Sequence, residues 1–167
     1  MDFEKWKKYV HGAWEEYSLY KNKEEGKHFF VHIDPMELQC TIVNIERKLH
    51  IDFPQELRCF FEQIGEGYCW ANKKQKVGIY NILSPDGMDC IYFPDEEEDW
   101  FITYRKRAWD NLNDGLLAFC IMNEEDSMLY YDIYNGQVYY LSRSRKIADS
   151  LCDFLTLLDN QVDYFIK

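Results

Sequence analysis

The sequence has no hydrophobic run long enough to cross a membrane, and its first residues, MDFEKWKKYVHGAW, contain no apolar core of an export signal. We therefore expect the protein to act in the cytoplasm. The six cysteines are widely and unevenly spaced, and no CxxC pair occurs among them. Zinc-ribbon and thioredoxin chemistry are disfavoured for that reason. The cysteines are expected to be reduced and mostly buried thiols.

Short motifs of common enzymes are also missing. The sequence contains neither the GxxxxGK[ST] loop that binds phosphates nor the GxSxG turn that carries a nucleophilic serine. Gly65-Glu66-Gly67 begins like a dinucleotide fingerprint, but Trp70 stands where the third glycine would be. His28 and His32 would share one face of a strand, yet no further ligand stands at metal-motif spacing. We expect a protein without catalysis, cofactor or metal.

Negative charge is abundant and unevenly distributed along the chain. The net charge is -11, and residues 77–142 hold thirteen acidic against three basic residues, a balance of -10. The remainder, with seventeen acidic and sixteen basic residues, is nearly neutral. Such a field repels nucleic acid and anionic lipid and speeds the encounter with a basic partner. The alternative is that the acidity only keeps the protein in solution.

Helical patterns flank a series of strand patterns. Apolar spacing, proline positions and capping residues predict helices over 3–17, 35–49, 54–64 and 147–158. Strands are expected at HFFVHI, VGIYNIL, CIYF, WFITY and LLAFCIM, with a turn over 84–87 and a short helix around RKRAWDNL. The predicted fold class is α+β: an antiparallel meander sheet with N-terminal helices and a C-terminal helix packed on it.

The segment LYYDIYNGQVYYL, residues 129–141, predicts a hairpin that turns at Asn135-Gly136. A two-residue turn pairs Tyr134 with Gln137 and Tyr131 with Tyr140. One face is expected to enter the core, and the other to be an amphipathic aromatic surface typical of protein interfaces. The second face carries Tyr130, Asp132, Tyr134, Tyr139 and Leu141. The alternative is that a helix covers it.

The segment LSRSRK, which follows this hairpin, is basic through Arg143, Arg145 and Lys146, and Ser144 is a candidate cap for the last helix. A counter-charge to the acidic strands is favoured there over a site for RNA or phosphate.

Two stretches resemble the SUKH superfamily, which includes fungal cell-wall-synthesis regulators and bacterial toxin-immunity proteins. In IVNIERKLHIDFPQELRCFFEQIGEG, the matching positions are Glu46, Phe53, Pro54, Leu57, Phe60 and Gly65. In LLAFCIMNEEDSMLYYDIYNGQVYYL and IADSLCDFLTLL, they are Asp126, Tyr131, Asp132, Gly136, Val138, Ser150, Phe154 and Leu155. The chain departs from the pattern at Glu125, where a glycine is usual, and at Ile64, where an asparagine is frequent.

This resemblance implies a single SUKH-like domain over residues 1–167, with 1–35 as an N-terminal helical and strand extension. It also implies a binding protein without catalysis that neutralises a cognate polymorphic toxin, often a nuclease. Expected partners are a basic toxin domain and neither nucleic acid nor membrane, and the protein is expected to be a monomer or weak dimer. The alternatives are a regulatory scaffold that binds a cellular protein and an enzyme that acts on a small ligand in a pocket lined by the sheet, although nothing in the sequence selects a catalytic pair among the thirty acidic residues.

The partner-binding residues are expected in two acidic loops and on the tyrosine face of the hairpin, where charge raises the encounter rate and buried rings prolong the complex. They are Asp95, Glu96, Glu97, Glu98, Asp99, Trp100, Glu124, Glu125, Asp126, Tyr130, Asp132, Tyr134 and Tyr139.

Overall fold

The computed structural model describes residues 2–17, 28–70, 79–94, 99–122, 127–161 and 164–165, with only the backbone described at 70, 79 and 99–103. Within these ranges an eight-stranded sheet follows the order of the sequence from one edge to the other. All neighbouring strands are antiparallel except the first two, which are parallel. The strands are β1 (Val10–His11), β2 (His28–Val31), β3 (Glu66–Trp70), β4 (Ile79–Ile82), β5 (Leu116–Met122), β6 (Ser127–Asp132), β7 (Val138–Tyr140) and β8 (Lys146–Ala148).

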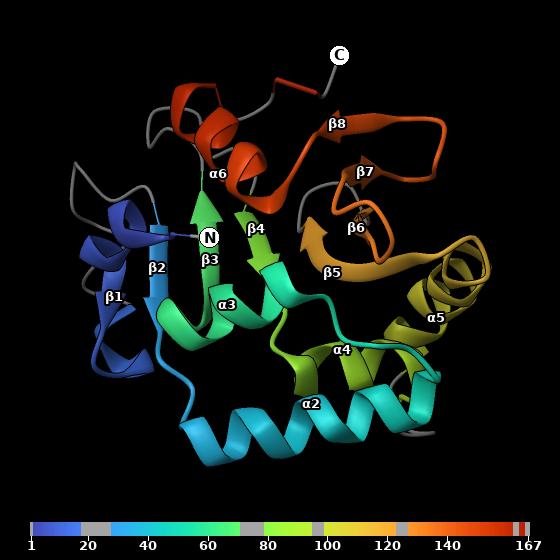
Figure 1. The fold of residues 1–167 in the computed structure, drawn as a ribbon, viewed down its shortest axis with the longest axis horizontal. Helices are drawn as coiled ribbons and strands as arrows, with labels where there is room; N and C mark the ends of the chain where they lie inside the picture. The colour runs from blue at the N-terminus through green and yellow to red at the C-terminus, as the bar shows by residue number, and fades with distance from the viewer. Residues whose placement is uncertain are drawn as a thin grey trace.

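Helices lie on both sides of this sheet, with α6 above the strands and α2 and α4 below them in Figure 1. The α-helices are α2 (Pro35–Leu49), α3 (Gln55–Gln63), α4 (Pro85–Tyr92), α5 (Asp99–Leu112) and α6 (Leu151–Asn160). Asp34, Ser84 and Ser150 cap α2, α4 and α6, each accepting from backbone N–H groups of the first turn. The predicted α+β meander is confirmed. None of the described helices has the length and apolar character needed to span a bilayer.

The predicted helix over 3–17 is wrong for most of its length. The structure has the 3₁₀ helices η1 (Glu4–Tyr9) and η2 (Trp14–Glu16) with β1 between them. Val10 and His11 leave the helical path because they pair with Phe30 and Val31 of β2. Phe3 and Trp6 are fully buried, and the ring of Phe3 lies 5.3 Å from that of Phe60. The N-terminal segment therefore shares the main core.

Two predicted strands are also wrong. CIYF belongs to α4, and WFITY belongs to α5. The predicted turn over 84–87 is the first turn of α4, since Ser84 accepts from the N–H of Gly87 and Pro85 occupies the first helical position. A short apolar run has no periodicity that separates a strand from a buried helix. The strands β3 and β8 were not predicted.

The hairpin has the predicted faces but different partners. Tyr131 pairs with Val138 rather than Tyr140, and Tyr130 pairs with Tyr139. The N–H of Gly136 donates to the carbonyl of Asp132, and the N–H of Asp132 donates to that of Gln137, so the loop has four residues instead of two. A shift of two residues preserves which side chains share a face.

Both faces of the sheet centre are covered. Every residue of β5, β6 and β7 is buried. Phe119 of β5 lies 6.2 Å, ring to ring, from Phe154 of α6. On the other side the hydroxyl oxygen of Tyr92 in α4 accepts from the N–H of Ala118 in β5 at 2.9 Å. This double cover explains why LLAFCIM is apolar throughout and does not alternate.

Candidate functional site

The predicted tyrosine face of the hairpin is not a surface. Tyr130 is 1% exposed, Tyr139 is 6% exposed and Asp132 is fully buried. The exposed members of this face are Tyr134, at 78%, and Leu141, at 42%. The alternative, that a helix covers this face, is correct for Tyr130, which interacts with Asn111 and Arg107 of α5. Burial raises the pKa of the Tyr130 phenol to about 12.

The exposure of the two predicted acidic loops, residues 95–99 and 124–126, is not described by the structure. Asp95, Glu96, Glu97, Glu98, Glu124, Glu125 and Asp126 lie outside the described residues. Asp99 and Trp100 begin α5, but their side chains are not described. Binding through these residues stays a prediction.

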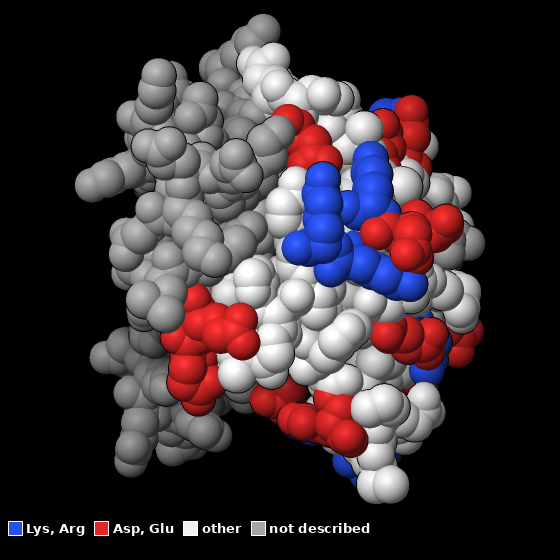
Figure 2. Space-filling model, turned by 90° about the vertical axis from the view of Figure 1, so that its left-hand side faces the viewer, with Lys and Arg blue, Asp and Glu red and all other residues white. Residues whose placement is uncertain are grey.

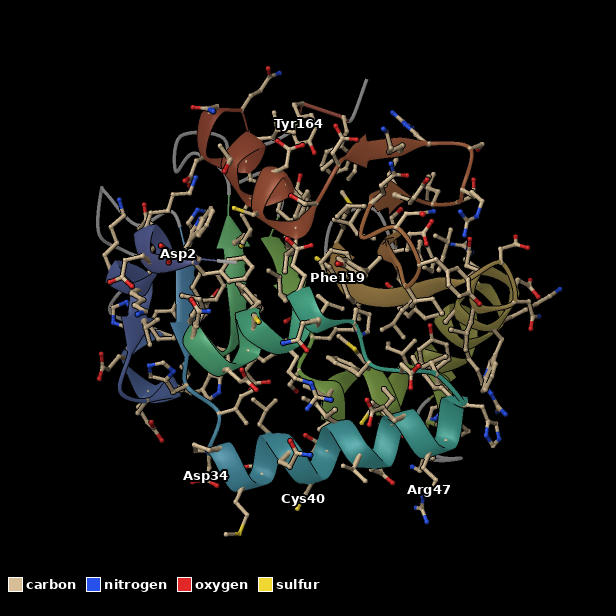
Figure 3. The ribbon with its side chains drawn as sticks, viewed as in Figure 1. Asp2, Asp34, Cys40, Arg47, Phe119 and Tyr164 are labelled. Atoms are coloured by element: carbon tan, nitrogen blue, oxygen red, sulfur yellow. The ribbon has the colours of Figure 1, made fainter. Side chains whose placement is uncertain are left out.

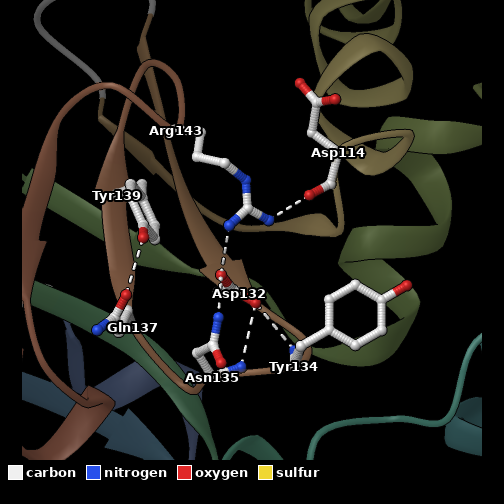
Figure 4. A network of polar contacts seen from close by, with 7 residues as sticks. All are labelled: Asp114, Asp132, Tyr134, Asn135, Gln137, Tyr139 and Arg143. Carbon is white, nitrogen blue, oxygen red and sulfur yellow. Dashed lines mark hydrogen bonds and ion pairs between the residues drawn. The ribbon is translucent and has the colours of Figure 1, made fainter.

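Asp132 organises the loop of the hairpin (Figure 4). One carboxylate oxygen accepts from the N–H groups of Tyr134 and Asn135 at 2.9 and 3.1 Å. The other pairs with Arg143 at 2.7 Å. Burial alone would raise the pKa of this carboxyl, but the hydrogen bonds and Arg143 together hold it below its ordinary value. The charged form of Asp132 thus serves the fold, and Arg143 is the counter-charge that the basic segment predicted.

The same arginine connects this loop to its neighbours. Arg143 also donates to the carbonyl of Asp114, in the turn between α5 and β5 (Figure 4). Its guanidinium carbon lies 5.7 Å from the centre of the Tyr139 ring. The ring of Tyr134 lies against Gly115, where an added Cβ would be 2.5 Å from a ring carbon. Tyr134 is therefore an exposed aromatic residue on a well-supported loop.

Glu56 of α3 is a buried carboxylate that the sequence analysis missed. It is 5% exposed and accepts from the hydroxyl of Tyr131 at 2.8 Å and from the N–H of Leu151 at 3.0 Å. The N–H of Cys152 donates to its second oxygen at 3.3 Å. The carboxylate thereby caps α6 from a segment 95 residues away. No spacing signal in the sequence identifies such a partner.

Glu46, one of the positions of the SUKH pattern, joins α2 to α3. Its carboxylate accepts from the N–H of Phe53 at 2.9 Å and from Arg58 at 3.2 Å. His50 ends α2 in the left-handed conformation, with φ at 55°. The pattern of glutamate, short break and aromatic helix thus has a structural role, because Glu46 connects α2 to the segment that begins α3 and to α3 itself.

The described residues offer no arrangement typical of catalysis. His28 is 1% exposed and bonds Asp159 at 2.6 Å, whereas His32 is exposed, so the two histidines do not share a site. Within the described ranges no group of three or more histidine, cysteine, aspartate or glutamate residues is placed to hold a metal ion. The buried carboxylates Glu56 and Asp132 are each engaged by several donors.

Basic side chains gather on one side of the described surface. Helix η1 exposes three lysines, Lys5, Lys7 and Lys8. Figure 2 shows the side of the molecule that carries β1, where most visible basic side chains form one group and acidic side chains lie above, beside and below it. Charges of both signs are therefore interspersed on this side of the molecule.

The architecture is that of an α+β domain built around a sequential meander sheet, with its buried polar groups used for structure. The chain matches the SMI1 / KNR4 family (SUKH-1) over residues 39–157, more than half of its length. It belongs to that family, as the SUKH resemblance predicted. No curated protein matches the chain.

Proposed function

We propose that this protein is a non-catalytic immunity protein that neutralises a cognate polymorphic toxin by direct binding. The observation that carries the proposal is membership of the SMI1 / KNR4 family over residues 39–157. The engagement of its buried carboxylates in structural hydrogen bonds supports a role in binding. The interaction would take place in the cytoplasm of the producing cell.

The toxin domain would be basic, and a nuclease is the first expectation. The net charge of -11 favours a cationic macromolecule over nucleic acid or an anionic membrane. Nuclease clefts carry positive charge because they bind phosphates, so an acidic protein can block the cleft or bind beside it. Charge accelerates association, and buried apolar contacts then slow dissociation.

The product of the neighbouring open reading frame provides the test. If that product carries a toxin domain, the two proteins should co-purify when co-expressed, and growth inhibited by the toxin should be restored. An unrelated toxin of similar activity is the control, since protection against it would indicate a general effect. Normal toxicity in the presence of this protein would contradict the proposal.

The alternative function is a regulatory scaffold that binds a cellular protein. An isolated gene, with no toxin encoded beside it, would favour that alternative. Recovery of the same cellular partner from cells with and without a toxin gene would support it.

A further inference from the structure

The N-terminal half of α2 stands between two pockets. The larger, of about 240 Å³, lies toward α3 and is lined by Ile33, Pro35, Leu38, Gln39, Ile42 and Glu62. The smaller, of about 130 Å³, lies toward the start of α4 and is lined by Ile33, Glu37, Thr41, Glu66, Ser84 and Asp86. Ile33 contributes to both, so the two pockets adjoin. We call this surface, together with the exposed side of α2, the α2 groove.

The exposed side of α2 carries apolar side chains. Met36 is 78% exposed and Val43 is 50% exposed, and Cys40 between them is also exposed. Spacings of four and three residues place these side chains on one face of the helix. Figure 3 shows Cys40 and Arg47 pointing away from the rest of the molecule on this side. An apolar stripe beside a pocket is a surface that gains stability when a partner covers it.

The rim of the α2 groove is acidic. Glu37, Glu66 and Asp86 line the smaller pocket, and Glu62 lines the larger. Within the described part of the chain, no lysine or arginine forms an ion pair with any of these four carboxylates. Arg58 donates to Gln39 of the larger pocket, but it is already paired with Glu46.

We propose that the α2 groove is the docking site for a cationic amphipathic segment of a protein partner. Naming that partner as the basic toxin domain rests on the function proposed above. An apolar side chain of the segment would enter the larger pocket beside Leu38 and Ile42. Lysine or arginine side chains would reach Glu37 and Asp86 across the smaller pocket and neutralise carboxylates that form no ion pair with a described cation.

The negative charge of the α2 groove favours a protein occupant over nucleic acid or an anionic lipid surface. Carboxylates on the rim repel the phosphates of nucleic acid and of anionic lipid. A second copy of this chain, bound through Lys5, Lys7 and Lys8 of η1, is the competing protein occupant, and the test separates it. The proposal does not depend on the acidic loops predicted from the sequence, whose side chains are not described.

The test measures binding of the toxin domain encoded in the neighbouring gene to the full chain by surface plasmon resonance. Met36→Ala combined with Val43→Ala should weaken binding at least tenfold, mainly through faster dissociation. Glu37→Lys combined with Glu62→Lys should weaken it at least tenfold through slower association and reduce its salt dependence. The matched control is Glu15→Lys combined with Asp110→Lys, which makes the same charge change at exposed positions that line neither pocket.

The outcomes distinguish the two proposals. Binding by the wild type and the control but not by the groove variants, with unchanged unfolding midpoints, supports the α2 groove. Equal binding by all variants overturns the groove and leaves the proposed function standing. Absence of binding by the wild type overturns both. A groove variant that is monomeric while the wild type dimerises would identify a second copy as the occupant and overturn the toxin assignment.

Discussion

At the scale of single residues, two buried carboxylates connect segments that are far apart in the sequence. Glu56 brings α3, β6 and the start of α6 to one point, and Asp132 brings the hairpin loop to Arg143. Each carboxylate replaces lost hydration with several directed hydrogen bonds. Removing either one leaves donors without an acceptor in the interior, so both are expected to matter for stability.

Glu56→Ala should lower the free energy of unfolding by about 3 kcal/mol, because the Tyr131 hydroxyl and two backbone N–H groups lose their acceptor. Urea denaturation followed by tyrosine and tryptophan fluorescence measures this. Glu62→Ala on the same helix is the control, since Glu62 is exposed and its loss should change stability by less than about 0.5 kcal/mol. Equal midpoints for both variants would contradict the role of Glu56.

Asp132 should make stability depend on pH. Its folded-state pKa is lower than in the unfolded chain, where it is about 3.9. The unfolded state therefore takes up the proton first as pH falls. The stability contributed by ionised Asp132 is complete above about pH 5 and is lost below about pH 4.

Asp132→Asn should accordingly lower the free energy of unfolding by about 2 kcal/mol at pH 7, with the difference narrowing toward pH 3. Urea titrations at several pH values measure this difference. Asp52→Asn, at an exposed position, should show no such trend. A difference that stays constant from pH 7 to pH 3 would exclude the ionised carboxylate as the stabilising form.

At the scale of elements, the contact between β2 and β3 depends on glycine. An added Cβ at Gly65 would lie 1.9 Å from the carbonyl oxygen of Val31, and one at Gly67 would lie 2.0 Å from that of Phe29. Gly65-Glu66-Gly67 is thus required by close strand approach, which explains glycines that resemble the start of a nucleotide motif.

Gly67→Ala should destabilise the protein by about 3 kcal/mol or more, because the new methyl group meets rigid backbone. Gly87→Ala provides the contrast: its Cβ would meet neighbours no closer than 3.5 Å inside α4, so a gain of about 0.5 kcal/mol is expected from helix propensity. Thermal unfolding of both variants measures the difference. Similar melting temperatures for the two would show that the strands can separate at little cost.

At the scale of the whole molecule, the net charge of a sequence segment does not predict where charge lies on the surface. Residues 77–142 hold most of the net charge, but the side chains of eight of their thirteen acidic residues are not described. Asp132, from the same window, is buried and paired. Four of the described carboxylates that form no ion pair with a described cation line the α2 groove, and three of these four come from outside that window.

Long-range charge should still govern the association rate. Reversing Glu96, Glu97 and Glu98 to lysine should slow association with the basic toxin domain about tenfold at low salt and flatten its salt dependence. Tyr134→Ala should instead speed dissociation, whereas Tyr139→Ala should lower stability because Tyr139 is buried. Stopped-flow association at two salt concentrations measures the first effect. An unchanged rate would show that the loop does not steer the partner.

The sequence by itself determined the fold class, the family, α2, α3, β5 and the existence and faces of the hairpin. These depend on local signals: Asp34-Pro35 starts a helix, an unbroken apolar run forms a doubly covered strand, and Asn135-Gly136 turns the chain. Such signals act between residues a few positions apart, so they can be recognised without coordinates.

Only the tertiary structure decided which aromatic residues are buried and which described carboxylates pair with a cation. It also decided that CIYF and WFITY lie in helical segments and not in strands. Tyr130 is covered by α5, and Glu56 finds its donors on β6 and α6. Burial and pairing depend on segments brought together by the fold, and a one-dimensional pattern contains no term for that proximity. The α2 groove could not be predicted from the sequence for the same reason. Its two pockets are lined by residues of 33–42, 62, 66 and 84–86, which only the fold brings together.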